Sequence, residues 1–151
     1  MIRAAASLFL VLAVTSCASA PHRDPAWKTS LADAQRVAAT EKKPILMDFT
    51  GSDWCTFCKK LHAEVLDTPE FMAWAQKRVV LVELDYPRVP YQSSEEKKQN
   101  ADLAKKYTIA QYPTVIFADA DGKEIGRTGY SEGGAAAWIA NAEKILAQHG
   151  G

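Results

Sequence analysis

The sequence has few cysteines, no excess of either charge and no apolar run long enough to span a membrane. Its 151 residues include three Cys, and this small odd number excludes a scaffold held together by several disulfides. Lys and Arg number 18, as do Asp and Glu, so there is no electrostatic case for a nucleic-acid partner. With only three His, we expect no large metal centre. The length and an apolar content of 48% instead indicate one globular domain.

The first 20 residues differ from the rest of the chain. Arg3 is followed by an apolar stretch, Ala4–Val14, which only Ser7 interrupts. A membrane-spanning helix needs about 20 apolar residues, so this stretch is too short to cross a bilayer. A basic residue followed by a short apolar run is typical of a secretory signal peptide, and we therefore expect the protein to act outside the cytoplasm.

Two cleavage sites compete for the end of this signal peptide. Small residues up to Ala20 suit an ordinary signal peptidase, but Pro21 follows and hinders cleavage there. The segment Val14-Thr15-Ser16-Cys17 resembles the bacterial lipobox, which implies that Cys17 is lipidated and becomes the mature N-terminus. We favour this second site. It makes 1–16 a lipoprotein signal peptide and 17–29 a tether that holds the protein at the periplasmic or cell-surface side of a membrane, whereas the first site would give a soluble secreted protein.

From residue 30 onward, helical and strand-like patterns alternate. Short runs rich in β-branched residues predict buried strands, and the Asp-Gly pair at Gly122 predicts a hairpin to the last strand. This order predicts one α/β domain over 30–148, in which a mixed four-stranded sheet has helices on both faces and an extra N-terminal helix. The expected helices are 31–42, 55–66, 69–77, 94–107 and one capped by Ser131, and the expected strands are 45–49, 79–85, 113–117 and 123–128.

Cys55 and Cys58 directly follow the first expected strand and lie at the start of a helix. Unpaired N–H groups and the helix dipole at such a position lower the pKa of a Cys from about 8.5 to about 3.5–7.5. Cys55, nearer the helix start, is the expected exposed nucleophile, and Cys58, one turn further on, can resolve a mixed disulfide. Two other interpretations stay open. The pair could form a purely structural disulfide, or it could bind zinc with His62, which by itself is expected to be a solvated helix residue.

Three segments together resemble the sequence pattern of thioredoxins. Asp48-Phe49 ends the first strand, Trp54-Cys55-Thr56-Phe57-Cys58 follows it, and Tyr112-Pro113-Thr114 opens the next-to-last strand. The chain is similar to secreted bacterial thioredoxin-like proteins that receive electrons from transmembrane thiol carriers. The resemblance covers about residues 30–148 and implies a thioredoxin-like sandwich.

The resemblance also implies roles for single residues. Pro113 is expected to follow a cis peptide bond beside the thiols, which turns the backbone of Tyr112 toward a substrate strand. Asp48 matches the acid that accepts the proton of the resolving cysteine, here Cys58. Asp53 is a second candidate for this proton, because the loop before the first cysteine is one residue longer than in typical thioredoxins.

The remaining site residues are apolar or lie at a strand start. Leu81 takes the place of the lysine that accompanies the acid in thioredoxins. Trp54, Phe57 and Tyr112 are expected to surround the thiols with apolar surface and, together with Thr114, to contact the substrate.

The sequence therefore predicts an extracytoplasmic thiol–disulfide oxidoreductase, a reductase or an isomerase, that exchanges electrons through Cys55 and Cys58 without a cofactor. The expected partners are protein disulfides, an upstream membrane thiol reductase, and the membrane itself through a lipid on Cys17. The alternatives are a thioredoxin-like binding protein for metal handling or for haem or copper maturation, and a tethered interaction module with an inert disulfide.

Overall fold

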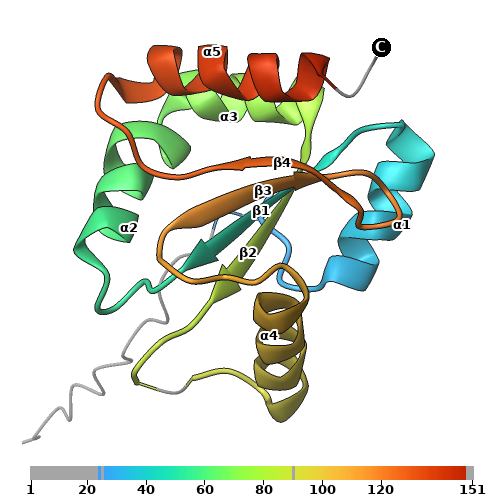
Figure 1. Ribbon diagram of the computed structural model, residues 1–151, viewed down its shortest axis with the longest axis vertical. Helices are drawn as coiled ribbons and strands as arrows, with labels where there is room; N and C mark the ends of the chain where they lie inside the picture. Colours follow the sequence, from blue (N-terminus) through green and yellow to red (C-terminus); the bar gives the residue numbers. More distant parts are fainter. Residues whose placement is uncertain (1–23, 25, 90, 149–151) are drawn as a thin grey trace, which may run out of the picture.

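The structure, a computed structural model, describes residue 24, residues 26–89 and residues 91–148 (Figure 1). The expected helices and strands are all present in this part of the chain, and the third helical segment, η1, is a π-helix. In order, the elements are α1 Leu31–Glu41, β1 Ile45–Thr50, α2 Thr56–Leu61, η1 His62–Leu66, α3 Pro69–Arg78, β2 Val80–Asp85, α4 Ser94–Lys106, β3 Thr114–Ala118, β4 Glu124–Thr128 and α5 Gly134–Ala147.

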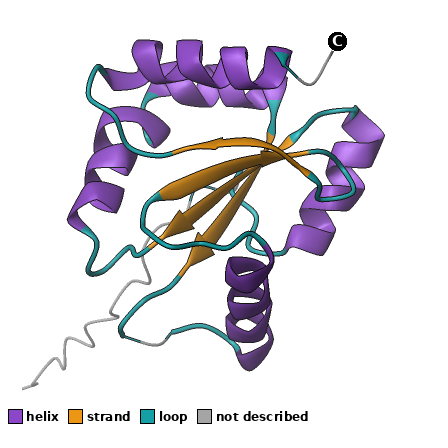
Figure 2. Cartoon of the chain, in the orientation of Figure 1, coloured by secondary structure: helices purple, strands orange, loops and turns teal. Residues whose placement is uncertain are grey.

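The four strands form one mixed sheet in the order β2-β1-β3-β4 (Figure 2). β1 and β2 are parallel and are joined by a crossover through α2, η1 and α3. β3 is antiparallel to both β1 and β4. The turn between β3 and β4 uses Gly122 with a φ of 77°, a left-handed conformation that favours glycine. The predicted fold class, an α/β sandwich with a mixed four-stranded sheet, is confirmed.

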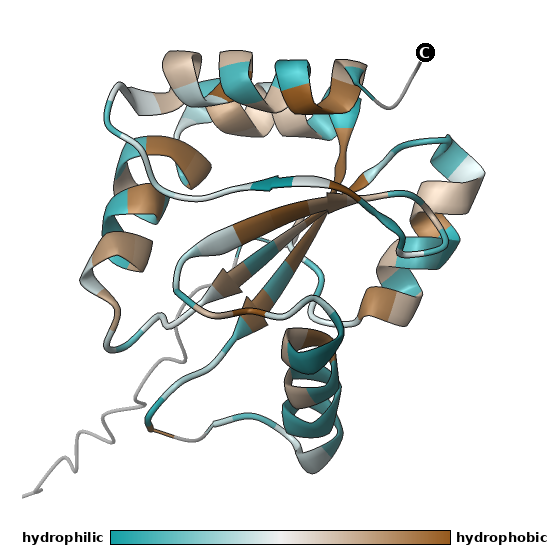
Figure 3. Cartoon of the chain, in the orientation of Figure 1, coloured by the Kyte–Doolittle hydropathy of each residue, from teal (hydrophilic) through white to brown (hydrophobic). Residues whose placement is uncertain are grey.

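Two apolar cores lie on the two faces of this sheet. In Figure 3 the hydrophobic colour of the sheet is concentrated in β1, β2 and β3, whereas the edge strand β4 is more polar. Residues of α2, η1, α3 and α5 cover one face, and residues of α1 and α4 cover the other. Alternate residues of β1 point to opposite faces, so Leu46 lies in the first core and Met47 in the second. The same alternation turns Asp48 toward the first core, under α2 and η1.

Capping side chains account for most helix starts. The hydroxyl groups of Ser30 and Thr68 each accept a backbone N–H of the first helical turn at 3.2 Å. Ser93 caps α4, directly before the first residue of the expected helix 94–107. The prediction that Ser131 caps the last helix, α5, is wrong. That helix begins after Gly133, whose φ of 119° needs glycine and which offers no side-chain cap.

The folded part of the chain extends into the predicted tether, residues 17–29. Trp27 is buried in the first core. Lys28 bridges to β2, where its N–H donates to Leu81 at 3.0 Å and its carbonyl accepts the N–H of Glu83 at 2.8 Å. The predicted signal peptide, 1–16, and the lipidation site Cys17 lie outside the described residues. Among the residues that the structure does describe, no helix has the length and apolar character of a membrane span.

Candidate active site

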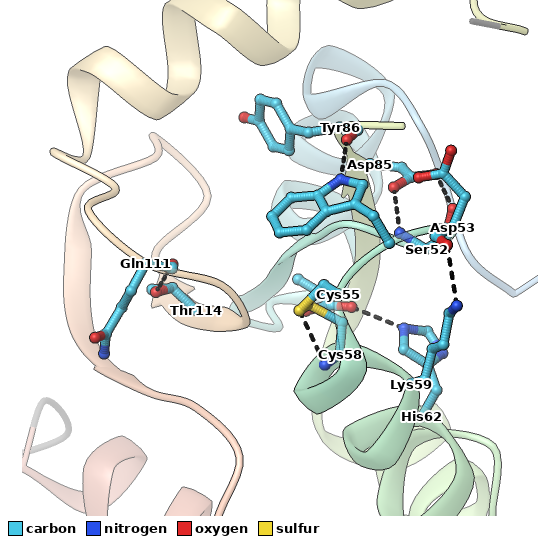
Figure 4. Close-up of a disulfide and its surroundings, with 12 residues drawn as sticks. Ser52, Asp53, Cys55, Cys58, Lys59, His62, Asp85, Tyr86, Gln111 and Thr114 are labelled. Atoms are coloured by element: carbon cyan, nitrogen blue, oxygen red, sulfur yellow. Dashed lines mark hydrogen bonds and ion pairs between the residues drawn. A yellow bond between two sulfur atoms is a disulfide. The ribbon is translucent and has the colours of Figure 1, made fainter. Parts of the chain in front are cut away.

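The two cysteines of the motif lie where β1 passes into α2. Cys55 occupies the N-cap of α2, and its sulfur accepts the backbone N–H of Cys58 at 3.1 Å. The two sulfurs form a disulfide with their Cα atoms 5.2 Å apart (Figure 4). The junction of a buried strand and a helix therefore carries a redox-capable pair, as the sequence predicts.

Both cysteines are more buried than the sequence suggested. Cys55 is 6% exposed and Cys58 is 1% exposed, so the order is as predicted but only a small part of Cys55 reaches the surface. The neighbouring Phe57, in contrast, is 57% exposed. Its ring lies 5.8 Å from that of Tyr130, and the ammonium group of Lys60 lies 5.9 Å from both rings. An aromatic surface with one cation over it thus borders the disulfide.

The peptide bond between Tyr112 and Pro113 is cis, as predicted. Beside it lies a groove of about 620 Å³ that brings together four of the predicted site residues, Phe57, Tyr112, Pro113 and Thr114. The hydroxyl group of Thr114 donates to the carbonyl of Gln111 at 2.8 Å, so this side chain also holds the turn before β3 (Figure 4). The cis peptide bond and three aromatic side chains, those of Phe57, Tyr112 and Tyr130, thus lie along one groove.

Trp54 does not line this groove and is held on the other side of Tyr112. Its indole N–H donates to the carbonyl of Tyr86 at 2.8 Å, and its ring meets the ring of Tyr112 edge-on at 5.6 Å. The guanidinium group of Arg88 lies 5.1 Å above the indole. A Cβ atom on Gly51 would lie 2.4 Å from the indole, so the close approach of the ring requires glycine there.

Asp53 fastens the loop after β2 to the loop that precedes the disulfide. Its carboxylate accepts the backbone N–H groups of Arg88 and Val89 at 2.9–3.1 Å. The N–H of Val89, followed by that of Arg88, lowers the pKa of the Asp53 carboxyl below its ordinary value. A carboxylate held in this way is a weaker proton acceptor, so these contacts favour Asp48 over Asp53, the second candidate that the sequence offered for the proton of Cys58.

A buried carboxylate, which the sequence analysis missed, also supports the loop that precedes the disulfide. Asp85 ends β2 and is buried. It accepts the backbone N–H of Ser52 at 2.9 Å and the Ser52 hydroxyl at 2.5 Å (Figure 4). It also accepts the hydroxyl of Tyr91. The sequence signal that singled out Asp48, an acid at the end of an apolar strand, applies equally to Asp85 and could have found it.

Asp48 is completely buried and forms an ion pair with His62. Nε2 of His62 lies 2.9 Å from Oδ2 of Asp48, and Nδ1 lies 3.2 Å from a carboxylate oxygen of Asp67. The second Asp48 oxygen, Oδ1, is buried without a hydrogen-bond partner. Burial disfavours the charged ring, but the hydrogen bonds and charges of Asp48 and Asp67 outweigh this and raise the pKa of His62 to about 9.

The prediction that His62 is a solvated helix residue is therefore wrong. Its side chain is 23% exposed, because the helix turns it inward against β1. Both ring nitrogens of His62 face carboxylates, and the sulfurs of Cys55 and Cys58 are bonded to each other. This arrangement does not correspond to the zinc site with Cys55, Cys58 and His62 as ligands that was considered from the sequence. In the register of β1 and β2, the residue beside Asp48 is Glu83, not Leu81. The positively charged partner of Asp48 is therefore His62 of the helical segment, and not a residue of the neighbouring strand.

A cavity of about 600 Å³ opens on this side of the disulfide, away from the groove at Pro113. Cys58 and His62, one helical turn apart, both line it, together with Thr50 from β1 and Trp27 from the N-terminal segment. The rings of Trp27 and His62 are 6.1 Å apart. Asp48 does not line this cavity, so His62 stands between the buried carboxylate and the open space.

Comparison with known proteins agrees with this geometry. The model of the thioredoxin-like domain matches residues 31–142, most of the chain. The protein belongs to the thioredoxin-like family. With its Cys55–Cys58 disulfide, it is a thiol–disulfide oxidoreductase of that family.

Individual relatives of this thioredoxin-like protein are bacterial. The disulfide bond reductase DsbH of Chlamydia pneumoniae is 35% identical over 117 residues, which are 78% of this chain and 70% of the relative. The solved structure of a DsbH oxidoreductase aligns with a TM-score of 0.77 at 32% identity and covers 87% of this chain and 94% of the other. The thiol:disulfide interchange protein DsbD of Pectobacterium atrosepticum is 29% identical over 96 residues, 64% of this chain but only 15% of that protein.

Proposed function

We propose that the protein is an extracytoplasmic disulfide reductase that is held at a membrane by a lipid on Cys17. The observation that carries this proposal is the Cys55–Cys58 disulfide at a strand-to-helix junction in a thioredoxin-like fold. The DsbH relative is named a disulfide bond reductase, which supports electron flow toward the substrate. The signal-like segment 1–16 and the lipobox before Cys17 support the compartment and the anchor.

The reaction starts from the dithiol form of the protein. The Cys55 thiolate, which the N–H of Cys58 stabilises, attacks one sulfur of a substrate disulfide and releases the other as a thiolate. The Cys58 thiol then loses its proton and attacks Cys55. The Cys55–Cys58 bond forms, the mixed disulfide breaks, and the second substrate sulfur leaves as a thiolate. Asp48, buried under the same helix with one unpartnered oxygen, is the proposed acceptor of the Cys58 proton.

The groove at Pro113 is the proposed substrate site. Its exposed Phe57 and its cis Tyr112–Pro113 backbone suit an extended segment that carries a disulfide next to the active site. Trp54, which packs against Tyr112 from outside the groove, limits the site on its other side. A membrane thiol carrier is the proposed upstream reductant, which the similarity to DsbD proteins supports.

Reduction of insulin by the protein, with a supplied dithiol as electron source, tests the activity. We expect wild-type protein to accelerate insulin precipitation and Cys55→Ser to be inactive. A wild-type rate no greater than that of Cys55→Ser would refute the proposal. The direction is tested by the reduction potential: a value near about −270 mV fits a reductant, whereas one near about −120 mV fits an oxidant.

The anchor is tested separately by fractionation of cells that produce the full chain. We expect the wild-type protein in the membrane fraction and Cys17→Ser in the soluble extracytoplasmic fraction. An identical distribution of the two proteins would contradict lipidation at Cys17 and would leave the redox activity unaffected.

A further inference from the structure

We propose that His62 is a positioning residue for the buried Asp48 carboxylate and provides the path by which the proton of Cys58 reaches solvent. This inference rests on the proposed function, in which Cys58 resolves a mixed disulfide. It adds to that function a chain of three groups, Asp48, His62 and Asp67, that leads from the interior to the surface. The argument depends on the contacts, the burial and the charges around His62.

The contacts form a continuous path of decreasing burial. The side chain of Asp48 is 0% exposed, that of His62 is 23% exposed and that of Asp67 is 63% exposed. The two ring nitrogens join these carboxylates, with Nε2 at 2.9 Å on the inner side and Nδ1 at 3.2 Å on the outer side. Because imidazole can release a proton from one nitrogen and accept one at the other, it can connect a buried acid to water.

The helix geometry brings this path to the resolving cysteine. His62 follows Cys58 by one turn, and both residues line the cavity of about 600 Å³. η1 starts at His62, and the wider π turn lets the N–H of Asp67 reach the carbonyl of His62 at 2.9 Å. The same turn brings the Asp67 carboxylate to the outer ring nitrogen. In a regular α-helix, the carbonyl of His62 would instead accept the N–H of Leu66, the residue before Asp67.

The charges around the ring favour the imidazolium form. Asp48 of β1 and Asp67 after η1 contact the ring, and two further acids, Asp24 and Glu83, line the same cavity. Lys59 is the cation among the described residues that line this cavity with His62. The ammonium group of Lys59 is bound to the carbonyl of Asp53 at 3.0 Å. The titratable and charged groups that contact His62 or line the cavity with it are Asp24, Asp48, Cys58, Lys59, Asp67, Glu83 and Tyr91.

The proton balance of the resolving step then follows. Cys58 gives its proton to Asp48 and its electron pair to the new bond with Cys55, and the substrate thiolate leaves. Neutral Asp48 no longer stabilises the positive ring, so His62 releases a proton toward Asp67 and water. The pair returns to carboxylate and imidazolium after a net loss of one proton. His62 is the titratable residue whose side chain both hydrogen-bonds to Asp48 and lines the cavity, so its removal takes away this connection.

Release of thionitrobenzoate from Ellman's reagent tests this inference, because it separates the two thiol steps. All proteins carry Cys17→Ser, so that only Cys55 and Cys58 react. The first release reports attack by Cys55 and depends on reagent concentration, whereas the second reports resolution by Cys58 and does not. For His62→Ala near neutral pH we expect the first step within about twofold of wild type and the second slowed at least about tenfold, since positioned proton transfer contributes about 10²–10⁴-fold.

Three comparisons distinguish a proton path from a structural role of the ring. Free imidazole, which the adjacent cavity can admit, should restore the second step of His62→Ala in proportion to its neutral form. His62→Gln, a second variant that keeps a hydrogen-bond donor but cannot carry a proton, should be slow without rescue. As the pH rises, the difference from wild type should become smaller, because hydroxide can then remove the Cys58 proton without help from His62. Lys77→Gln, which removes an exposed positive charge from α3, is the matched control and should behave as wild type.

The contrary results are equally distinct. A second step that stays unchanged in both His62 variants overturns the proton path, as does a slowing that is equal for both steps, independent of pH and insensitive to imidazole. Absence of the first release in wild-type protein would instead remove the proposed redox function, and the proton path with it. The insulin assay of Cys55→Ser against wild type identifies that case independently.

Discussion

Raising the pH from about 6 to about 9.5 should destabilise the oxidised protein through loss of the proton on His62. The pKa of His62 is raised from 6.5 to about 9 in the folded protein, so the folded state binds this proton more tightly than the unfolded state. The stabilisation is fully present below about pH 6.5 and is lost as the pH rises through about 9. A pKa difference of about 2.5 corresponds to about 3 kcal/mol of unfolding free energy. The ring is only 23% exposed, so solvent screens little of this contribution.

Urea unfolding of the oxidised protein, followed by circular dichroism at several pH values, measures this contribution. His62→Gln is the reference, because it keeps all other groups that titrate over the same range, and both proteins carry Cys17→Ser to prevent thiol exchange. We expect the advantage of wild type over His62→Gln to shrink by about 3 kcal/mol between pH 6 and pH 9.5. A difference between the two proteins that stays constant over this range would show that His62 is not held in its charged form by Asp48 and Asp67.

Three further predictions concern packing around the disulfide and in the core. Gly51→Ala should lower the unfolding free energy, measured with urea, by about 1–3 kcal/mol and change Trp54 fluorescence, because the new methyl group collides with the indole; unchanged fluorescence and stability would contradict the described contact. Asp85→Asn should cost about 1–3 kcal/mol of unfolding free energy and speed proteolysis of the loop after β2, because Ser52 and the Tyr91 hydroxyl of that loop lose a charged acceptor; equal cleavage rates would argue against this anchor. Trp138→Ala should cost about 3–5 kcal/mol, since the ring is 1% exposed and donates to a backbone carbonyl, and an unchanged melting temperature would be the opposing result.

Much of the fold was predictable because each strand is a short apolar run between clear turn or helix signals. β1 and β2 are such runs, and the Asp-Gly turn at Gly122 marks the β3–β4 hairpin. The cysteine pair was predictable for the same local reason, since the motif follows the end of β1 directly. Local signals also produced the errors: Ser131 resembles a helix cap in sequence, yet the two glycines after it let the chain start α5 later.

The partners of the site residues were not predictable, since they depend on contacts between distant segments. His62 meets Asp48 across 14 positions of sequence, and a helix pattern alone does not show which face of α2 and η1 lies over β1. Asp53 reaches the N–H of Arg88 across 35 positions. The π turn that positions Asp67 follows from tertiary packing and has no sequence signature of its own.

The way in which Asp53 holds the loop after β2 has a consequence for engineering. Its carboxylate accepts hydrogen bonds from main-chain N–H groups, which every residue except proline possesses. The anchor therefore does not depend on which side chains the loop carries. Val89, whose backbone is bound there, is 70% exposed. The side chain at position 89 can therefore be exchanged for any other except proline without loss of the anchor at Asp53, which makes this position a place to introduce new surface chemistry near the disulfide.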